Sequence, residues 1–286
     1  MPEKPLISII TVNLNDLEGL KRTMTSVFEQ TFKEFEYIII DGGSTDGSKE
    51  YIERHSNKID TWVSEKDSGI YNAMNKGIKA ASGEYLLFLN SGDTFYNMKV
   101  LSKVNEYVKD DWDILFGNVQ LYGHSKKELN KLVIYPEKLT FSFFFSNTII
   151  HQAAFIKREL FDEVFYYNED LKFVSDWEFF LCAICKFNYS YKKLDFTVTN
   201  FNMNGFSSDP VNKKSLNKER ELCLKTHFPL MLEDYKELFQ LRLQLNIPSV
   251  KASLELEDFI TARKINRTIV HFLLGISKLK NGKFEL

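Results

Sequence analysis

The chain has 286 residues and carries 37 Lys and Arg against 39 Asp and Glu, so its formal charge is −2. This near-neutral balance excludes recruitment to nucleic acid or to an anionic membrane by a global positive field. The length is enough for one large domain or two small domains with full cores.

The three cysteines are an odd number, and residues 1–5 run into a strand pattern with no signal-peptide pattern. We therefore expect a reduced, cytoplasmic protein. No apolar run reaches the roughly 18 residues that a membrane-spanning helix needs. Cys182 and Cys185 form a C-x-x-C pattern inside an apolar stretch of helical spacing, without a second pair. We interpret them as core thiols rather than as a zinc or redox site.

The first hundred residues alternate strand-like and helix-like segments, which predicts an α/β fold with a largely parallel sheet. Strands are predicted at 7–12, 37–40, 61–64 and 84–89, and helices at 19–30, from Ser44 or Thr45 to Arg54, and at 70–81. Right-handed crossovers with a reversal after the third strand give the strand order 3-2-1-4. Ligands of such sheets bind where the winding reverses, outside the carboxyl ends of the strands.

Beyond residue 110 the chain mixes strand-like pieces at 114–122, 131–135 and 147–156 with a helix around 177–186. We expect this section to pack on the edge of the same sheet and to complete an acceptor pocket. From residue 212 onward the pattern is helical. The predicted organisation is a catalytic domain over 1–211, with a nucleotide half over 1–110 and an acceptor half over 111–211, followed by a C-terminal helical extension over 212–286.

Polar segments follow each of the four predicted strands. They are Val12-Asn13, Asp41 with two glycines, Asp67-Ser68-Gly69, and Asn90-Ser91-Gly92-Asp93. Because the carboxyl ends of parallel strands meet at one edge of a sheet, we expect these segments to converge. Glycines permit close approach of the backbone to a ligand, and the helix that begins after Gly69 favours an anion. The segments together predict a site for a nucleotide with a diphosphate.

Asp93 is the predicted ligand of a cation, Mn²⁺ or Mg²⁺. These ions prefer oxygen ligands, and one carboxylate suffices when phosphates and waters complete the coordination shell. A turn acid is the alternative for Asp93, since Ser-Gly-Asp is common in turns. Asp41 is placed to accept the ring N–H of uracil or a ribose hydroxyl, with helix capping as its alternative. Asp67 is placed to bind ribose.

The stretch from Ile7 to Asp93 resembles the nucleotide-binding half of the family 2 glycosyltransferases of GT-A fold, particularly those that build bacterial surface polysaccharides. The matching segments are 8–13, 40–48, 67–77 and 83–93. The resemblance implies that Asp41 contacts the base, that Asp67 contacts the nucleoside, and that Asp93 is the last acid of a D-x-D metal-binding signature. Asn90 and Gly92 stand where acids are frequent in that signature.

Family members that invert the anomeric centre use a carboxylate as general base, usually from an acidic pair that opens a later helix. Residues 175–178, Ser-Asp-Trp-Glu, resemble that pair with Ser175 in place of the first acid. Asp176 is therefore the predicted base, Glu178 its substitute, and Trp177 a surface on which a sugar ring stacks. Capping of the helix by Ser175 and Asp176 is the alternative.

Two further segments resemble parts of this branch of the family. His151-Gln152 resembles a His-Gln pair and is predicted to contact the diphosphate or the acceptor, with a buried structural histidine as the alternative. The segment 204–208, which includes Gly205 and Ser207, resembles a loop that closes on donor phosphates. A plain surface turn is the alternative for this loop.

The C-terminal helical pattern contains two apolar stripes. The second has basic residues nearby, and its members are Ile265, Ile269, Phe272, Leu273 and Ile276, with Arg263, Lys264, Arg267, Lys278, Lys280 and Lys283 around them. Such a stripe can lie peripherally on the inner face of a membrane, where lipid-linked acceptors reside. Packing on the catalytic domain, or on a second copy of the chain in a homodimer, is favoured over that alternative.

The sequence thus predicts a metal-dependent, inverting glycosyltransferase that moves a hexose-type sugar from a nucleotide diphosphate, most simply a UDP-sugar, to a glycan or lipid-linked glycan acceptor. A sugar-nucleotide pyrophosphorylase is one alternative, but residues 13–17 lack the Gly-rich basic loop expected there. A nucleotide- or glycan-binding protein without turnover is the other. No G-x-G-x-x-G follows the first strand, which disfavours a dehydrogenase.

Overall fold

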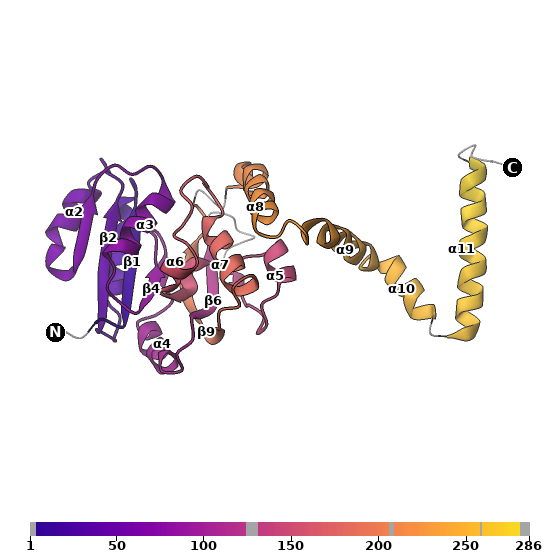
Figure 1. Cartoon of the computed structure of the whole chain (residues 1–286), viewed down its shortest axis with the longest axis horizontal. Helices are drawn as coiled ribbons and strands as arrows, with labels where there is room; N and C mark the ends of the chain where they lie inside the picture. Colours follow the sequence, from indigo (N-terminus) through magenta and orange to yellow (C-terminus); the bar gives the residue numbers. More distant parts are fainter. Residues whose placement is uncertain (1–3, 124–130, 206–208, 258, 281–286) are drawn as a thin grey trace. The chain divides into compact units, whose positions relative to one another are not determined.

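A computed structural model describes residues 4–123, 131–205, 209–257 and 259–280 (Figure 1). The chain divides into two compact units, Met1–Cys223 and Leu224–Leu286. The helical extension was expected to begin at residue 212. In the structure, α8 (Lys213–His227) begins there, but most of this helix belongs to the first unit.

The first unit is built on one sheet in the order β3-β2-β1-β4-β8-β6-β9-β5, with β7 paired to β6. The predicted order 3-2-1-4 is confirmed, and these four strands run parallel. The remaining strands form a mixed section in which β8 is antiparallel to both β4 and β6. The strands are β1 Ile7–Asn13, β2 Phe35–Asp41, β3 Thr61–Ser64, β4 Tyr85–Phe88, β5 Thr94–Phe95, β6 Ile114–Tyr122, β7 Lys131–Val133, β8 Ala154–Lys157 and β9 Tyr191–Asn202.

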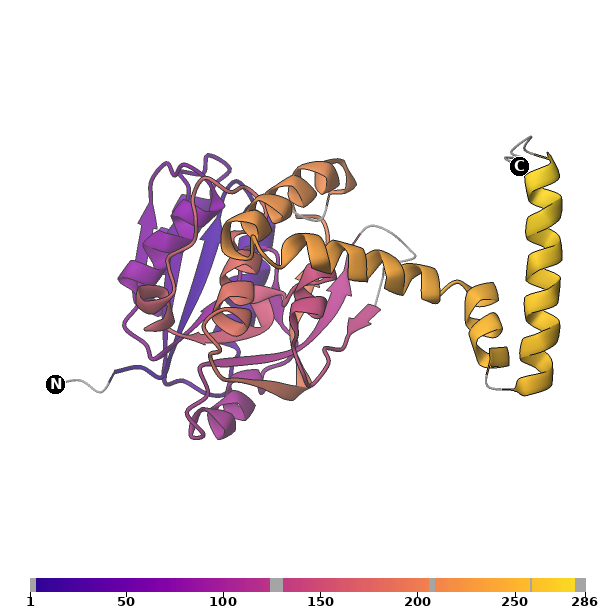
Figure 2. The same ribbon diagram turned by 45° about the vertical axis from the view of Figure 1, so that its right-hand side comes forward.

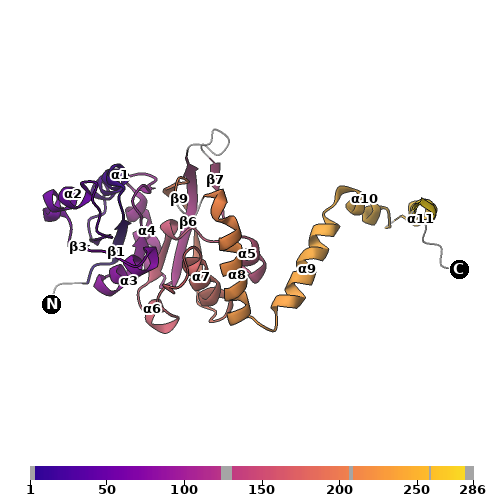
Figure 3. The ribbon, with the colours of Figure 1, turned by 90° about the horizontal axis from the view of Figure 1, so that it is seen from above.

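Helices cover both faces of the parallel part of the sheet. Figure 3 shows α1 and α2 on one face and α3 on the other, as expected when the winding direction reverses after β3. The helices of the first unit are α1 Leu17–Phe28, α2 Ser48–Arg54, α3 Ile70–Ala80, α4 Val100–Val108, α5 Phe141–Ser146, α6 Leu160–Glu163 and α7 Ser175–Cys185. Short 3₁₀ turns lie at Ser56–Lys58, His151–Ala153 and Pro210–Asn212.

The central strand β1 is buried along its whole length, including its polar residues. The Thr11 hydroxyl donates to the Leu89 carbonyl at 2.8 Å, and the Ser8 hydroxyl donates to Glu36 at 2.5 Å. A buried hydroxyl is tolerated when it has a hydrogen-bond partner. These contacts align β1 with the strand ends on either side of it.

Two predicted elements differ from the structure. The strand expected over 147–156 is confined to β8, because His151–Ala153 form a 3₁₀ turn that carries two candidate site residues. The helix expected to begin at Ser44 or Thr45 begins at Ser48 instead. Ser44 does not cap that helix, since its hydroxyl and its backbone N–H both donate to Asp41. Asp46 accepts from Ser48 at the helix start.

The second unit contains the helices α9 (Leu232–Leu245), α10 (Pro248–Glu257) and α11 (Ile260–Lys280) (Figure 2). Among the helices of the described residues, none combines the length and the apolar character required to cross a bilayer. Beyond Leu232, the side chains described in this unit are exposed or half-buried.

The contact between α3 and β1 gives a test of the fold. A Cβ added at Gly77 would lie 2.4 Å from Cγ2 of Ile10, a buried β-branched side chain with little freedom to move. We therefore expect Gly77→Ala to lower the free energy of unfolding by about 1–3 kcal/mol, despite the better helix propensity of alanine. Urea unfolding measures this, with Ala80→Ser on the exposed side of the same helix as the control. Equal stability of Gly77→Ala and wild type would contradict the close α3–β1 contact.

Candidate active site

The carboxylate of Asp41 lies fully buried at the end of β2 and joins three strand ends. It accepts hydrogen bonds from Asn13 Nδ2 at 2.7 Å, from Ser64 Oγ at 2.7 Å, and from both the hydroxyl and the backbone N–H of Ser44 at 2.6 Å and 3.0 Å. Burial raises the pKa of Asp41, but these hydrogen bonds outweigh it and hold the pKa below its ordinary value. An ionised Asp41 thus fixes the ends of β1, β2 and β3 relative to one another.

Asp67 lies beside the same strand ends. A Cβ added at Gly42 would lie 2.4 Å from Asp67 Oδ2, so the carboxylate rests against the backbone that follows Asp41. Its other oxygen accepts from the Gly69 N–H at 3.0 Å. Gly69 has φ +144°, which disfavours any residue with a side chain, and it immediately precedes α3. Asp41 and Asp67 are therefore neighbours, as the sequence predicted.

The segment Asn90–Asp93 is held beside the end of β1. The Ser91 N–H donates to the Val12 carbonyl at 3.0 Å, and the Thr23 hydroxyl, from α1, donates to the Asp93 carbonyl at 2.6 Å. Because Asn13 is bonded to Asp41, the acidic segments after β2 and β4 meet across the end of β1. The positions of Asp41, Asp67 and Asp93 thus agree with the predicted convergence at one edge of the sheet.

Asp93 itself is only 4% exposed. Its Oδ1 accepts from the Asn202 N–H at 2.8 Å, and its Oδ2 accepts from Gln152 Nε2 at 3.0 Å. Burial raises the pKa of Asp93 to about 7, despite these hydrogen bonds and the nearby His151. A carboxylate that is difficult to ionise without a cation beside it is suited to a cation site.

The oxygen ligands in this region fit a hard divalent ion. Each Asp93 oxygen accepts one of these two hydrogen bonds and keeps acceptor capacity for another contact. Asp16 is a second acid nearby: its Oδ2 lies 3.4 Å from the position of a Cβ on Gly92, and its charge raises the pKa of Asp93 further. Within the described ranges there is no cluster of three or more His, Cys, Asp or Glu able to hold a metal. One or two carboxylates suffice for such an ion where phosphates and waters complete its coordination shell.

Asp176, the predicted base, lies in the first turn of α7 between two hydrogen-bond donors. Its Oδ2 is 2.9 Å from His151 Nδ1, and its Oδ1 accepts from the Tyr71 hydroxyl of α3 at 2.8 Å. The side chains of His151 and Asp176 are 11% and 15% exposed. His151 Nε2 lies 3.3 Å from Asn90 Nδ2. A continuous hydrogen-bonded chain therefore runs from α3 through Asp176 and His151 to the segment that carries Asp93.

The surroundings of Asp176 favour its ionised form. Burial raises its pKa, but the hydrogen bond and charge of His151, followed by the Tyr71 hydroxyl, outweigh burial and hold the pKa of Asp176 below its ordinary value. Burial and the negative charge of Asp176 hold the pKa of Tyr71 well above its ordinary value, so this phenol stays protonated and donates. An ionised carboxylate with residual exposure can accept a proton from a bound hydroxyl.

The capping alternative for residues 175 and 176 is not used. The residue that precedes α7, Val174, provides no side-chain cap, and the Ser175 hydroxyl accepts instead from the Asn168 N–H. Glu178, the predicted substitute for Asp176, is buried and interacts with the thiol of Cys223. At about 100° per residue, Glu178 lies about 200° around α7 from Asp176. The structure therefore favours Asp176 over Glu178 as the base.

The prediction that Trp177 stacks on a sugar is wrong in this structure. Trp177 is 1% exposed, and its Nε1 donates to the carbonyls of Phe144 and Asn147 at 2.8 Å and 3.1 Å. The indole is part of the core beneath the site, where it fixes α7 against α5. Its face contacts the guanidinium of Arg220, 5.0 Å from the ring centroid.

Arg220 of α8 is a charged neighbour of Asp176. It was not predicted as a site residue, because residues 212–286 were expected to form a separate extension. Burial lowers the pKa of Arg220, while the charge of Asp176 raises it. Glu219, its neighbour, accepts from the backbone N–H groups of Lys172 and Phe173 at 3.0 Å and 2.9 Å. These contacts fix α8 to the loop before α7. In the sequence, Arg220 is one of five Lys or Arg residues in the segment 213–227, and such a pattern is typical of a solvated helix face.

Tyr71 and Asp16 were also missed. Tyr71 reads as an ordinary aromatic residue of an amphipathic helix, and only the tertiary contact to Asp176 distinguishes it. Asp16 reads as a helix cap, and it does accept from the Gly19 N–H at 3.0 Å. Of the closing-loop residues, Gly205 is exposed, whereas Ser207 lies outside the described residues.

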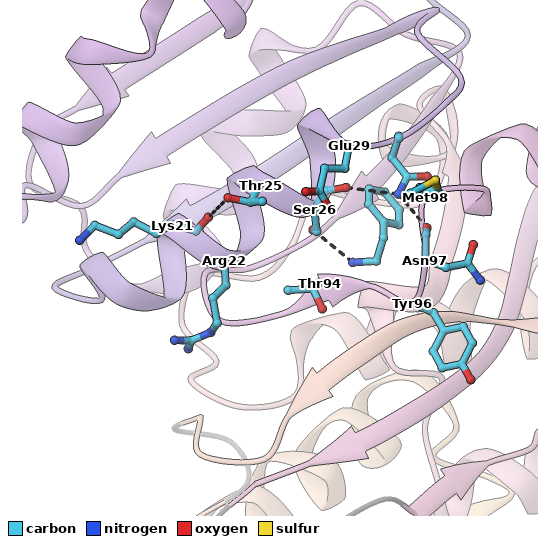
Figure 4. Close-up of a pocket in the computed structure, with 11 residues that line it drawn as sticks. Lys21, Arg22, Thr25, Ser26, Glu29, Thr94, Tyr96, Asn97 and Met98 are labelled. Atoms are coloured by element: carbon cyan, nitrogen blue, oxygen red, sulfur yellow. Dashed lines mark hydrogen bonds between the residues drawn. The ribbon is translucent and has the colours of Figure 1, made fainter.

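A hollow of about 470 Å³ lies beside this site between α1 and the segment after Asp93 (Figure 4). Its lining comprises Lys21, Arg22, Thr25, Ser26, Glu29, Gln30, Thr94, Phe95, Tyr96, Asn97 and Met98. None of the acids discussed above lines it. The candidate site is therefore the open edge of the sheet and not this hollow.

Comparison with known proteins agrees with this arrangement. Residues 8–165 match the family described as Glycosyl transferase family 2, which is more than half of the chain. The chain belongs to this family. Membership confirms the resemblance found in the sequence, and it favours a transferase over a pyrophosphorylase.

Relatives in sequence are bacterial glycosyltransferases. An uncharacterized glycosyltransferase of Mycobacterium tuberculosis is 33% identical over 205 residues, which are 66% of this chain and 77% of that protein. A PGL/p-HBAD biosynthesis glycosyltransferase of Mycobacterium bovis is 27% identical over 225 residues, 75% of this chain and 84% of that protein. The putative teichuronic acid biosynthesis glycosyltransferase TuaG of Bacillus subtilis is 32% identical over 151 residues, 51% of this chain and 60% of that protein.

Solved structures share the fold. S. aureus TarS 1–349 in complex with UDP-GlcNAc gives a TM-score of 0.61 at 21% identity, over 76% of this chain and 65% of that one. The mannosyltransferase PcManGT of Pyrobaculum calidifontis, in complex with GDP-Man and Mn²⁺, gives 0.52 at 14% identity, over 99% and 89%. At these identities the likeness establishes the GT-A fold alone.

The environment of Asp93 predicts a dependence of stability on pH. In the unfolded chain this carboxyl ionises near its ordinary value of about 4, whereas burial holds its pKa in the folded protein at about 7. Between these values only the unfolded state has lost the proton, so the contribution of Asp93 to the free energy of unfolding falls as pH rises through this window. Asp93→Asn removes that contribution.

We therefore expect Asp93→Asn to gain stability relative to wild type between about pH 5 and about pH 8. Urea unfolding of both proteins in the presence of a chelator measures the difference at each pH. Asp170→Asn, at an exposed acid on the surface, is the control, and its stability relative to wild type should be the same at both pH values. A wild-type-to-variant difference that is the same at both pH values would contradict the raised pKa.

Proposed function

We propose that the protein is an inverting glycosyltransferase that transfers a sugar from a nucleotide diphosphate, most simply a UDP-sugar, to a glycan or lipid-linked glycan during bacterial surface-polysaccharide synthesis. The observation that carries the proposal is the buried chain Tyr71–Asp176–His151–Asn90, which places an ionised carboxylate beside the segment that carries Asp93. Support for the donor comes from TarS, which was solved with UDP and with UDP-GlcNAc. Support for the pathway comes from the names of the relatives in PGL and teichuronic acid synthesis.

The donor nucleotide would bind along the ends of β1, β2 and β3. Asp41 is fully buried and already accepts from Asn13, Ser44 and Ser64, so its part in binding uracil would be to order the strand ends around the base rather than to accept the ring N–H directly. Asp67 would accept from the ribose, and the segment Ser68–Gly69 would place the N-terminus of α3 near the phosphates. Val12 and the backbone of 90–92 would form the floor of this site.

Asp93, with Asp16 near it, would hold Mn²⁺ or Mg²⁺ together with the donor phosphates. When bound, the ion supplies positive charge that stabilises the departing nucleoside diphosphate. The raised pKa of Asp93 means that a proton competes with the cation for this carboxylate near neutral pH. Gln152 and the Asn202 N–H keep its two oxygens oriented.

Asp176 would remove the proton from the acceptor hydroxyl. As the new bond forms between that oxygen and the anomeric carbon, the bond from the anomeric carbon to the β-phosphate oxygen breaks, and the nucleoside diphosphate leaves with the electron pair. Attack from the side opposite the leaving group inverts the anomeric centre. The acceptor proton is held by Asp176 after transfer. It then passes to solvent, to which the Asp176 side chain is partly exposed.

His151 would act by positioning Asp176 rather than by touching the reacting atoms. In the neutral form its Nδ1–H donates to Asp176, and its Nε2 accepts from the Asn90 amide. This arrangement keeps the carboxylate oriented and ionised. It also transmits the position of the donor segment to the base, because the same imidazole contacts both.

Replacement of the base gives the first functional test. We expect Asp176→Asn to lower the rate of sugar transfer by about 10²–10⁴-fold and to leave UDP affinity within a few-fold of wild type, since an amide cannot take the proton. Release of UDP in the presence of acceptor measures transfer, and calorimetry measures UDP affinity. Glu178→Gln is the matched control and should retain transfer. If Glu178→Gln loses transfer while Asp176→Asn retains it, Glu178 is the base.

Removal of the metal ligand gives a second test. We expect UDP to bind wild type more tightly with Mn²⁺ than with a chelator, and Asp93→Ala to abolish that difference, because the ion loses its protein carboxylate. Calorimetry with UDP under both conditions measures the effect. Asp170→Asn, at an exposed acid, should keep the Mn²⁺ dependence. A metal-dependent affinity that survives in Asp93→Ala would remove Asp93 from the site.

A further inference from the structure

The helix α11 (Ile260–Lys280) separates apolar and basic residues onto opposite sides. At about 100° of rotation per residue, Ile265, Ile269, Phe272 and Leu273 fall within one face about 100° wide. Lys264, Arg267 and His271 fall on the opposite face. The segment 260–280 contains five Lys or Arg and no Asp or Glu, although the whole chain has a formal charge of −2. Positive charge is therefore concentrated on a helix whose other side is apolar.

Within the second unit, the apolar face of α11 is left uncovered. Ile265 is 57% exposed, Ile269 52%, Phe272 68% and Leu273 56%. The described part of α10 meets α11 beside this face, where Asn266 Nδ2 donates to Ser253 Oγ at 2.6 Å. Large apolar side chains gathered on one exposed face are unusual in a soluble monomer and indicate a surface that binds something.

We propose that α11 lies flat on an anionic phospholipid surface, with Ile265, Ile269, Phe272 and Leu273 inserted at the boundary between headgroups and acyl chains. A helix of about 10–12 Å diameter keeps its basic face within roughly one Debye length of the lipid phosphates. Charge complementarity favours this occupant: a second copy would bring the same unbalanced positive charge, whereas helix pairs are commonly flanked by residues of opposite charge.

The inference goes beyond the proposed transfer reaction and does not depend on it. It concerns where the enzyme works: a surface-bound protein meets an acceptor that is confined to two dimensions. The basic face supplies electrostatic attraction, and the apolar face supplies burial. Both contributions are required, because either alone gives weak, reversible binding.

Sedimentation of the full chain with phospholipid vesicles tests the inference. We expect the protein to bind phosphatidylcholine vesicles that contain about 30% phosphatidylglycerol, and to bind vesicles of phosphatidylcholine alone at least about tenfold more weakly. The affinity for the anionic vesicles should fall as salt is added. Lys264→Gln should weaken binding to the anionic vesicles about fivefold, as expected for one basic residue near the surface. Phe272→Glu should abolish it, since a carboxylate then faces the apolar region.

Matched controls lie outside α11. Leu230→Glu replaces a 91% exposed apolar residue, and Lys49→Gln removes an exposed positive charge on α2. Both should bind vesicles as wild type does. All variants should keep wild-type helical circular dichroism and UDP affinity, which separates this inference from the proposed function.

Three outcomes would overturn the inference. The first is that wild type does not bind anionic vesicles. The second is that Phe272→Glu binds them as wild type does. The third is that wild type is a dimer by light scattering, loses dimerisation in Phe272→Glu, and shows no vesicle binding; the apolar face would then belong to a second copy of the chain.

Discussion

The hydrogen bond between His151 Nδ1 and Asp176 Oδ2, 2.9 Å long, is the central contact of a chain that runs from Tyr71 to Asn90. His151 lies in the 3₁₀ turn before β8, and its other nitrogen faces Asn90, which follows β4. Asp176 begins α7 and also contacts Tyr71 of α3. The base candidate and the donor segment are therefore positioned by one imidazole. A change in the pairing of β4 with β8 would move His151 relative to Asn90.

Three buried or half-buried aspartates at this edge of the sheet have different surroundings, and their pKa values differ accordingly. Asp41 accepts several hydrogen bonds and is held ionised, which suits a residue that orders strand ends. Asp176 is held ionised by His151 and Tyr71, which suits a proton acceptor. Asp93 is dominated by burial and has a raised pKa, which suits a site completed by a cation. The same side chain thus ionises at a different pH in each of the three places, because its environment differs.

Sequence reasoning predicted most of the parallel half of the fold. The strand order, the helix beginning at Ile70 and the convergence of Asp41, Asp67 and Asp93 followed from local pattern, because a buried parallel strand has a continuous apolar run and its following residues lie at the sheet edge. It failed where local pattern is ambiguous. Residues 147–156 look like a strand, yet tertiary contacts turn His151–Ala153 out of the sheet. Trp177 was expected to stack on a sugar ring because the burial of a side chain cannot be predicted from its residue type alone.

The sequence by itself determined which residue types stand at the strand ends and that the last helix has a basic and an apolar side, since both depend only on spacing along the chain. Only the tertiary structure decided that Tyr71, His151 and Asp176 form one hydrogen-bonded chain, and that Arg220 of α8 lies over Trp177. These contacts join residues far apart in sequence. Side-chain contacts over such separations arise from the packing of whole elements, which local periodicity does not encode.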